Sequence, residues 1–439
     1  MRTLIKNGYV IDPAAEREGY YDVLLEGERI QRIEQDIHLE DTESVLLLDA
    51  AGCFVMPGFI DLHVHLREPG YEYKETIRTG SMAAAAGGFT TICPMPNTKP
   101  VTDSAEMVDL VLQKATQEGV VNILPIGAIT LGQEGRELTD IKSLAAAGAA
   151  ALSEDGKSVM DTALYEKALR QAAAAGIPVF AHCEDKSLVG GGVMNAGKKA
   201  EELGLEGISN AVEDIIAARD ILLAKETGAR LHLCHCSTKD SVKMIKAAKS
   251  EGLPVSGEVC PHHFTLSDED IPGDDSDYKM NPPLRSREDV VALKEALRDG
   301  TLEVIATDHA PHSKEEKERS FREAPFGIVG LETAFALTVT ELLHPGYLTA
   351  RQLVEKLSAN PARILGIDRG SLKLGSIADI VIADPEQEYL IDKNSFFSKG
   401  KNTPFHGRKV KGKIKFTLVS GRLVYDGDKH TILCLNEEV

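Results

Sequence analysis

The sequence predicts an α/β protein, a (β/α)8 barrel with a small β-sandwich built from both ends of the chain. Eight apolar, β-branched runs of strand length recur between Ala-, Glu- and Lys-rich stretches with helical spacing. Eight such units over about 300 residues are typical of a barrel. Side chains suited to metal binding also collect at the ends of these runs, where barrel active sites form.

The barrel elements follow from hydrophobic periodicity. We expect strands at residues 59–66, 90–96, 121–130, 149–155, 178–184, 229–237, 254–261 and 302–310. Between them, the apolar spacing predicts amphipathic helices at residues 76–86, 162–175, 212–225 and 240–250. A doubly wound open sheet is the competing fold, but no glycine-rich phosphate loop follows the first strand.

The two ends of the chain carry short alternating strands and turn residues instead. These strands are expected at residues 3–6, 22–25, 29–33, 44–48, 379–383 and 421–425. Neither end is large enough to fold alone. We therefore expect residues 1–57 and 371–439 to form one composite sandwich beside a catalytic barrel of residues 58–370.

Composition and charge exclude several classes of function. The 439 residues are 43% hydrophobic and 27% charged, and the net charge of −19 comes with no basic block suited to nucleic acid. No run approaches the roughly 18 apolar residues of a membrane span. Cysteines 93, 183, 234, 236 and 260 lie in strand-like runs, which favours buried, reduced thiols. The sequence indicates a cytoplasmic protein without a membrane or nucleic-acid partner.

The first predicted strand carries a metal-binding pattern. His63 and His65 lie two residues apart, so both imidazoles point to the same side of the strand. An isolated pair of this kind could equally be two surface histidines. Other strands end in further ligand-type residues, namely Glu154, Asp155, His182, His235 and Asp308. Each alone could be a core histidine or a capping carboxylate, but four imidazoles with one carboxylate from each of the fourth and eighth strands are typical of two zinc-like ions.

Two other histidine motifs have simpler explanations. Cys234 and Cys236 flank His235, but the strand alternation that directs His235 into a site directs both cysteines away. We interpret His262 and His263, after the seventh strand, as loop or packing residues.

Four longer motifs carry a family resemblance. The chain resembles the metal-dependent amidohydrolase superfamily over nearly its whole length, and in detail it is similar to the type I bacterial dihydroorotases. The motifs are DLHVHLREPG at residues 61–70, PMPNT at 94–98, NPPLR at 281–285 and ATDHAPH at 306–312.

The fourth strand decides the subgroup. Many superfamily members use a carboxylated lysine there, but residues 149–156 contain none, and the resemblance selects Asp155. It implies two zinc ions per subunit, one on His63, His65 and Asp308 and the other on His182 and His235, with Asp155 bridging. Whether the second position fills is left open.

The resemblance also implies the reaction, the reversible cyclisation of N-carbamoyl-L-aspartate to L-dihydroorotate in pyrimidine synthesis. A metal-bound hydroxide would attack the ring amide, with Asp308 as general acid and base. Arg67, Asn97 and His312 would hold the substrate carboxylate, while Asn281 and the backbone near Phe326 and Gly327 would meet the ring amides. A homodimer is expected, and an association with aspartate transcarbamoylase is compatible with the resemblance.

Two other functions compete with this interpretation. One is an allantoinase- or hydantoinase-like hydrolase, which the missing lysine and the presence of Arg67 and Asn97 disfavour. The other is an inactive relative that acts as a scaffold for aspartate transcarbamoylase, which should have lost metal ligands. The charged stretch at residues 313–319 is either an active-site lid or, slightly favoured, a solvated loop.

Overall fold

A closed barrel of parallel strands forms the centre of the molecule. The structure, a computed structural model, describes residues 2–40 and 45–433. The barrel strands are β6 (Phe59–Val64), β7 (Phe89–Pro94), β8 (Asn122–Ile123), β9 (Ile126–Ala128), β10 (Ala151–Ser153), β11 (Val179–Ala181), β14 (Leu231–Leu233), β15 (Val255–Val259) and β16 (Val304–Ile305). Every expected barrel strand is present, so the predicted fold class is confirmed.

Neighbouring strands pair in parallel around the ring, and a contact between its first and last members closes it. β6, β7 and β8 form one sheet, and β9, β10, β11, β14, β15 and β16 follow in order in a second. Val64 forms a parallel bridge with His309, and His65 N donates to His309 O at 2.8 Å. The third predicted strand is split into β8 and β9 because Pro125 lies between them and has no N–H to donate.

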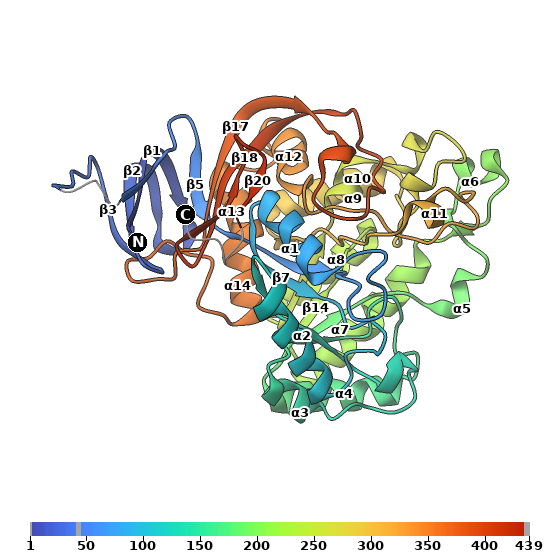
Figure 1. Cartoon of the computed structure of the whole chain (residues 1–439). Helices are drawn as coiled ribbons and strands as arrows, with labels where there is room; N and C mark the ends of the chain where they lie inside the picture. Colours follow the sequence, from blue (N-terminus) through green and yellow to red (C-terminus); the bar gives the residue numbers. More distant parts are fainter. Residues whose placement is uncertain (1, 41–44, 434–439) are drawn as a thin grey trace.

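Helices cover the outside of the barrel (Figure 1). The longer ones are α1 (Ile77–Ala86), α2 (Ala105–Glu118), α3 (Ile141–Ala147), α4 (Thr162–Ala175), α7 (Ala211–Thr227), α8 (Lys239–Ser250) and α10 (Arg287–Asp299). After the last strand come the shorter α12 (Ala334–Thr338), α13 (Ala350–Val354) and α14 (Asn360–Leu365). The four predicted helices are confirmed to within two residues at each end. Polar side chains cap several N-termini; Thr76, for example, accepts from Thr79 N in a capping box.

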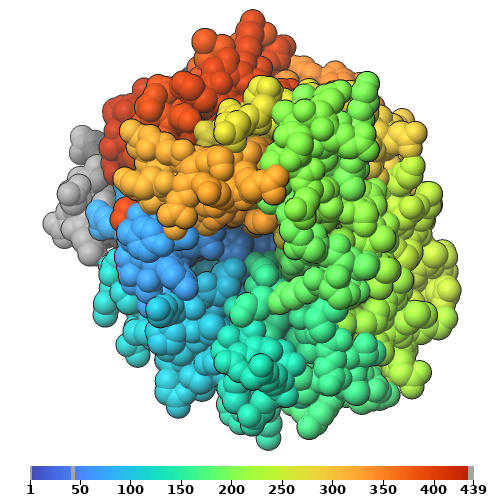
Figure 2. Space-filling model, turned by 90° about the vertical axis from the view of Figure 1, so that its right-hand side faces the viewer, coloured from blue at the N-terminus to red at the C-terminus, as the bar shows by residue number. Residues whose placement is uncertain are grey.

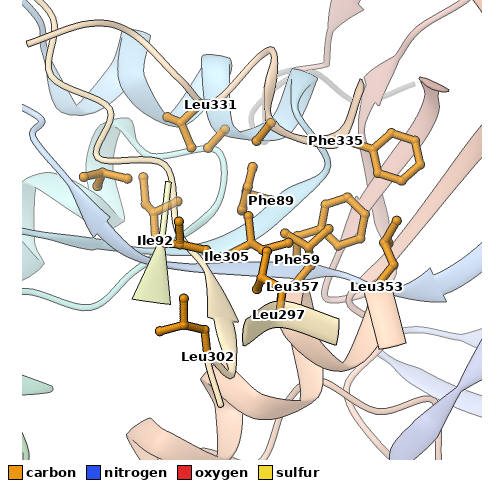
Figure 3. Packing of buried hydrophobic residues seen from close by; sticks show 14 of the residues in the cluster. Phe59, Phe89, Ile92, Leu297, Leu302, Ile305, Leu331, Phe335, Leu353 and Leu357 are labelled. Atoms are coloured by element: carbon orange, nitrogen blue, oxygen red, sulfur yellow. The ribbon is translucent and has the colours of Figure 1, made fainter. Parts of the chain in front are cut away.

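Aromatic and aliphatic side chains fill the space between strands and helices. Phe59 stacks on Phe335 of α12 with ring centroids 5.5 Å apart and meets Phe89 edge-on at 5.7 Å. Figure 3 shows these rings among leucines and isoleucines from the barrel and from helical segments near α10 and α13. Replacing one such phenylalanine by alanine typically costs about 3–5 kcal/mol. Phe59 and Phe89 are the first residues of β6 and β7, so this packing fixes the helices against the N-terminal ends of these strands.

A separate, mostly antiparallel sheet outside the barrel combines strands from both ends of the chain. It contains β1 (Arg2–Asp12), β2 (Arg17–Glu26), β3 (Arg29–Glu34), β4 (Val45–Asp49), β5 (Phe54–Pro57), β17 (Ile380–Leu390), β18 (Lys409–Val419), β19 (Arg422–Asp426) and β20 (Thr431–Ile432). The antiparallel pairing of β5 with β17 joins the two ends. Figure 1 shows this sheet beside the barrel. All six predicted terminal strands fall in this sheet, although Ser44 and residues 1 and 434–439 lie outside the described part.

Two further expectations concern the whole chain. The cysteines at 93, 183, 234, 236 and 260 are buried and free, as the sequence predicts. Within residues 2–40 and 45–433, no helix combines the length and the apolar character needed to cross a bilayer.

Candidate metal centre

The six predicted ligand residues meet at one end of the barrel. Each lies at or just past the C-terminal end of its strand. His63 Nε2 is 3.2 Å from Asp155 Oδ1, and His65 Nε2 is 3.1 Å from Asp308 Oδ1. His182 Nδ1 is 3.6 Å from Asp155 Oδ1 and 2.8 Å from His235 Nε2. All six side chains are buried. Asp155 therefore stands between the histidines of the first, fifth and sixth strands.

The backbone leaves its regular strand conformation at this centre. His235 and Asp308 have φ angles of +34° and +47°, a region that residues other than glycine rarely occupy. Such conformations cost free energy and collect at functional sites. One prediction is wrong here, because Cys234 does not face away from the site. Its sulfur forms a group with His63 and Glu258 in which all ligand-type atoms lie within 4.8 Å of one another. β14 ends at Leu233, so strand alternation no longer applies beyond it.

Unpaired buried atoms show that this donor set fits a cation. His63 Nε2 and Asp155 Oδ1 are buried and, although they lie 3.2 Å apart, neither has a hydrogen-bond partner of suitable geometry. Native proteins rarely leave such atoms unpaired. The close imidazole nitrogens of His182 and His235 also require a proton or a cation between them. Two overlapping groups have all their ligand atoms within 4.8 Å, one of His63, His65 and Asp308 and one of His63, Asp155 and His235. Imidazole and carboxylate donors of this kind suit zinc and similar divalent ions.

Polar partners hold three of these imidazoles by their outward nitrogens. His63 Nδ1 donates to Glu258 Oε1 at 2.9 Å, and His65 Nδ1 donates to Asn97 Oδ1 at 2.9 Å. His182 Nε2 donates to Glu184 Oε2 at 3.2 Å. With the outer nitrogen protonated, the inner nitrogen keeps its lone pair for a metal.

Sequence reasoning missed Glu258 and Glu184. A carboxylate inside an apolar strand run was the available signal, because a buried acid needs a partner. Burial opposes ionisation of Glu258, but His232 and His63 hold its pKa at about 2. It therefore stays an acceptor for His63.

The two carboxylates at the end of β10 have different environments. Burial would raise the pKa of Asp155, but His63, His182 and His235 hold it well below the ordinary value. Burial raises the pKa of Glu154, whose carboxylate accepts from Ile129 N and Thr130 N at 3.2 and 3.1 Å. The neighbours thus face different ways, and Asp155 faces the histidines. Asp308 is likewise kept anionic, because the adjacent histidines outweigh the effect of burial on its pKa.

A cavity of about 210 Å³ opens beside the six ligand-type residues. Figure 2 shows a hollow on this face of the molecule. The hollow lies between the blue chain near residue 70, the orange chain near residue 320 and the green chain. Larger cavities of up to about 360 Å³ lie elsewhere, and none of them contains this cluster. The lining residues include five of the six ligand-type residues and all six predicted substrate residues, Arg67, Asn97, Asn281, His312, Phe326 and Gly327.

Arg67 and His312 stand side by side on the cavity wall. Arg67 Nε donates to Pro311 O at 3.2 Å. His312 Nε2 donates to Phe326 O at 2.8 Å, and its Nδ1 lies 3.2 Å from Lys74 Nζ. Burial and the charges of Arg67 and Lys74 keep the pKa of His312 far below its ordinary value. His312 is therefore neutral, and Arg67 carries the positive charge of this wall.

Asn281 and Gly327 also line the cavity, and the backbone at Gly327 is closely packed. Asn281 Nδ2 donates to Glu184 Oε1 at 3.1 Å, which links the cavity to the partner of His182. Gly327 has a φ of +132°, and a Cβ there would lie 2.8 Å from Ala310 Cβ. Only glycine fits this position.

Two regions next to the cavity bear on predictions from the sequence: the pair His262 and His263, and the charged stretch at residues 313–319. His262 and His263 are buried on α9 (Pro261–Thr265), and His263 Nε2 donates to Pro282 O at 2.8 Å, so His263 packs against the NPPLR loop. Burial lowers the pKa of both, so both are neutral. Their ligand-type atoms also form a group with Cys260. The charged stretch contains α11 (Lys314–Lys317); Glu316 forms an ion pair with Lys74 Nζ at 2.9 Å, while Lys314, Glu315, Glu318 and Arg319 are exposed.

Comparisons with known proteins agree on one family. Residues 50–241 match the family described as "Dihydro-orotase-like". The chain is 49% identical to a dihydroorotase of Caldanaerobacter subterraneus over 98% of both sequences, and 48% identical to a dihydroorotase of Staphylococcus epidermidis over 97% of this chain and 100% of the other. Among solved structures, an L-hydantoinase (dihydropyrimidinase) from Arthrobacter aurescens superposes with a TM-score of 0.87 at 27% identity, covering 98% of this chain and 97% of the other.

Proposed function

The chain belongs to the dihydroorotase family of metal-dependent amidohydrolases, and on that premise we propose which of its residues perform the reaction. It is a cyclic amidohydrolase that interconverts N-carbamoyl-L-aspartate and L-dihydroorotate. The observation that carries the residue assignment is the meeting of six ligand-type side chains beside a cavity lined by a partly buried arginine.

In this proposal, divalent metal ions, with zinc the expected element and two the expected number, are held by the six residues His63, His65, Asp155, His182, His235 and Asp308. The unpaired His63 Nε2 and Asp155 Oδ1 support it. A metal ion bound there supplies Lewis acidity, which polarises the amide carbonyl and lowers the pKa of water.

The protein's own side chains bind the substrate and move the proton. Arg67 and Asn97 hold the carboxylate, and Arg67 can form a bidentate pair. In this assignment His312 positions the backbone of Phe326 through Nε2, and its ring edge closes the carboxylate subsite. Asn281 and the backbone of Gly327 contact the ring amide groups.

Asp308 is the group that transfers the proton. In hydrolysis, water adds to the ring amide carbonyl and the carbon–nitrogen bond breaks. Asp308 takes a proton from the attacking water and delivers it to the leaving nitrogen. Its lowered pKa keeps it ionised and ready to accept that proton. In cyclisation the same carboxylate moves the proton in the opposite direction.

The rival activity of a lysine-bridged hydrolase finds no support in strand four. The nearest lysine is Lys157, and its Nζ donates to Gln133 O at 2.9 Å. Asp155 occupies the place among the histidines instead. The chain is 48–50% identical to dihydroorotases but only 25–28% identical to the hydantoinase structures. The likeness to the hydantoinases therefore reflects the shared fold. The inactive-scaffold alternative is disfavoured because all six ligand-type residues are present.

We also propose that residues 1–57 and 371–439 form one domain and residues 58–370 the catalytic domain, which the pairing of β5 with β17 supports.

One experiment tests the assignment directly. Purified protein is assayed for dihydroorotate hydrolysis while its metal content is measured by elemental analysis, before and after treatment with a chelator and after addition of zinc. Activity should track bound zinc up to two equivalents. Full activity in metal-free protein would overturn the assignment.

A further inference from the structure

Asn402 joins two separate segments of the cavity wall from behind. Its Oδ1 accepts from His312 N at 3.2 Å. Its Nδ2 donates to Ala310 O at 3.1 Å and to Gly327 O at 3.0 Å. All three partners line the cavity, whereas Asn402 is buried and does not. One side chain therefore sets the distance between the loop after the eighth strand and the segment around Gly327.

The side-chain amide is fully used in this arrangement. An asparagine offers one acceptor oxygen and two N–H donors, and each has a partner here. Its backbone takes part as well, because Asn402 O accepts from Val329 N at 2.9 Å. A carboxylate of the same shape could not donate to either carbonyl, and a serine could donate to only one.

Asn402 can hold these segments because its own segment is firmly anchored. It lies in the connection between β17 and β18, and so belongs to the chain of the terminal sheet. Glu332 accepts from Phe397 N and Ser398 N at 3.0 and 3.1 Å, and Glu75 accepts from Ser398 Oγ at 2.5 Å. The anchored part thus fixes where Asn402 stands relative to the barrel.

The same connection between β17 and β18 also contacts Pro311, whose backbone oxygen accepts a hydrogen bond from Arg67. A Cβ at Gly400 would lie 2.7 Å from Pro311 Cβ, so the backbone of the connection is in close contact with Pro311. Pro311 O in turn accepts from Arg67 Nε. The carboxylate-binding wall is therefore shaped from outside the barrel at two neighbouring points.

We propose that Asn402 is a positioning residue of the reaction, which sets the spacing of Ala310, His312 and Gly327 around the substrate through its side-chain amide. The proposal rests on the proposed function of the cavity. Asn402 touches no substrate, and it acts through the backbone groups that do. A displacement of about 1 Å in such groups can cost about 10²-fold in rate.

The test compares Asn402→Ser with Asn402→Asp in the full-length zinc-loaded enzyme. Positioning by donated hydrogen bonds predicts that the serine variant keeps more activity, although it is smaller, because the aspartate has no donor and sets a charge against two carbonyls. We expect kcat/KM for dihydroorotate to fall about tenfold in Asn402→Ser and at least about 10²-fold in Asn402→Asp. A packing role predicts the reverse order, because aspartate keeps the shape of asparagine.

KM separates positioning from loss of folded protein. Partial unfolding lowers the number of active molecules and so the apparent kcat, but it leaves KM unchanged. We expect KM to rise in both variants at equal zinc content. Asn360→Asp is the matched control. Asn360 Nδ2 donates to Glu303 O, which precedes β16 and lies at the far end of the barrel from the ligand cluster. KM should not change in this variant.

The possible results distinguish a failure of the positioning role of Asn402 from a failure of the proposed function. If Asn402→Asp does not fold, Asn402→Ser is compared with Asn402→Ala, and the serine variant should have the lower KM. An unchanged KM in every folded variant, or equal values for serine and alanine, overturns the positioning role. An unaltered protein that does not hydrolyse dihydroorotate overturns the proposed function instead.

Discussion

Arg67 should make the substrate carboxylate indispensable. Its side chain is partly buried, and loss of contact with water lowers the pKa of the guanidinium. Among the described residues it forms no ion pair within 4.0 Å, so its charge is left for a ligand. Its Nε donates to Pro311 O, and its Nη2 lies 3.4 Å from His312 Nε2, a nitrogen that donates to Phe326 O; the remaining terminal N–H groups can pair with a carboxylate. Two charge-assisted hydrogen bonds at roughly 1.5–3 kcal/mol each correspond to about 3–6 kcal/mol, or roughly 10²- to 10⁴-fold in rate.

The measurement compares dihydroorotate with dihydrouracil, which has the same ring without the carboxylate. We expect kcat/KM to be roughly 10³-fold higher for dihydroorotate, because dihydrouracil leaves the charge of the partly buried Arg67 unpaired. Arg67→Met should remove most of this difference by damaging the dihydroorotate reaction. Arg136→Met, at an exposed arginine, is the control and should leave both values unchanged. Similar turnover of the two compounds by the unaltered enzyme would refute the reasoning.

Three further predictions concern the proton transfer and the ligands. Asp308→Asn should lower kcat in both directions by at least about 10²-fold, and activity within a few fold of the original would exclude its role in proton transfer. Asp155→Ala should lower bound zinc and activity together, whereas Glu154→Ala should leave the zinc in place, because the carboxylate of Glu154 faces Thr130. Elemental analysis measures the zinc content of both variants. The opposite pattern would contradict the assignment. Cyclisation takes up one proton near neutrality, so the equilibrium ratio of dihydroorotate to carbamoyl aspartate should fall about tenfold per pH unit, and a ratio independent of pH would mean that another reaction is catalysed.

The barrel and the ligand positions could be predicted because both depend on local signals. A buried parallel strand is an apolar, β-branched run, and each of the eight runs became a strand. Barrel geometry then brings the strand ends together, so His63, His182 and Asp308 could be placed in one site although they are far apart in sequence. The chemistry of the side chains identified the rest.

The sequence did not predict contacts that depend on tertiary packing. Nothing local to Asn402 indicates that it meets His312, some 90 residues away, because that contact depends on where the terminal sheet docks. That the two ends of the chain combine was predicted, but the particular pairing of β5 with β17 was not. The position of Cys234 was predicted wrongly because the regular strand ends one residue earlier and His235 adopts a positive φ. Periodicity says nothing about a residue once the periodic element has ended.

The charge of the cavity also depends on local arrangement rather than composition. A net charge of −19 opposes the approach of an anionic substrate. Among the residues that line the cavity only Asp155 and Asp308 are acidic, and both are proposed metal ligands, so bound cations would neutralise them. Arg67 adds a positive charge, and Lys279 and Lys317, with pKa values lowered by burial to about 8, lie against Phe326 and Gly327. With the proposed cations bound, the cavity would be positive in an acidic protein, and a dianion such as carbamoyl aspartate would encounter this local excess.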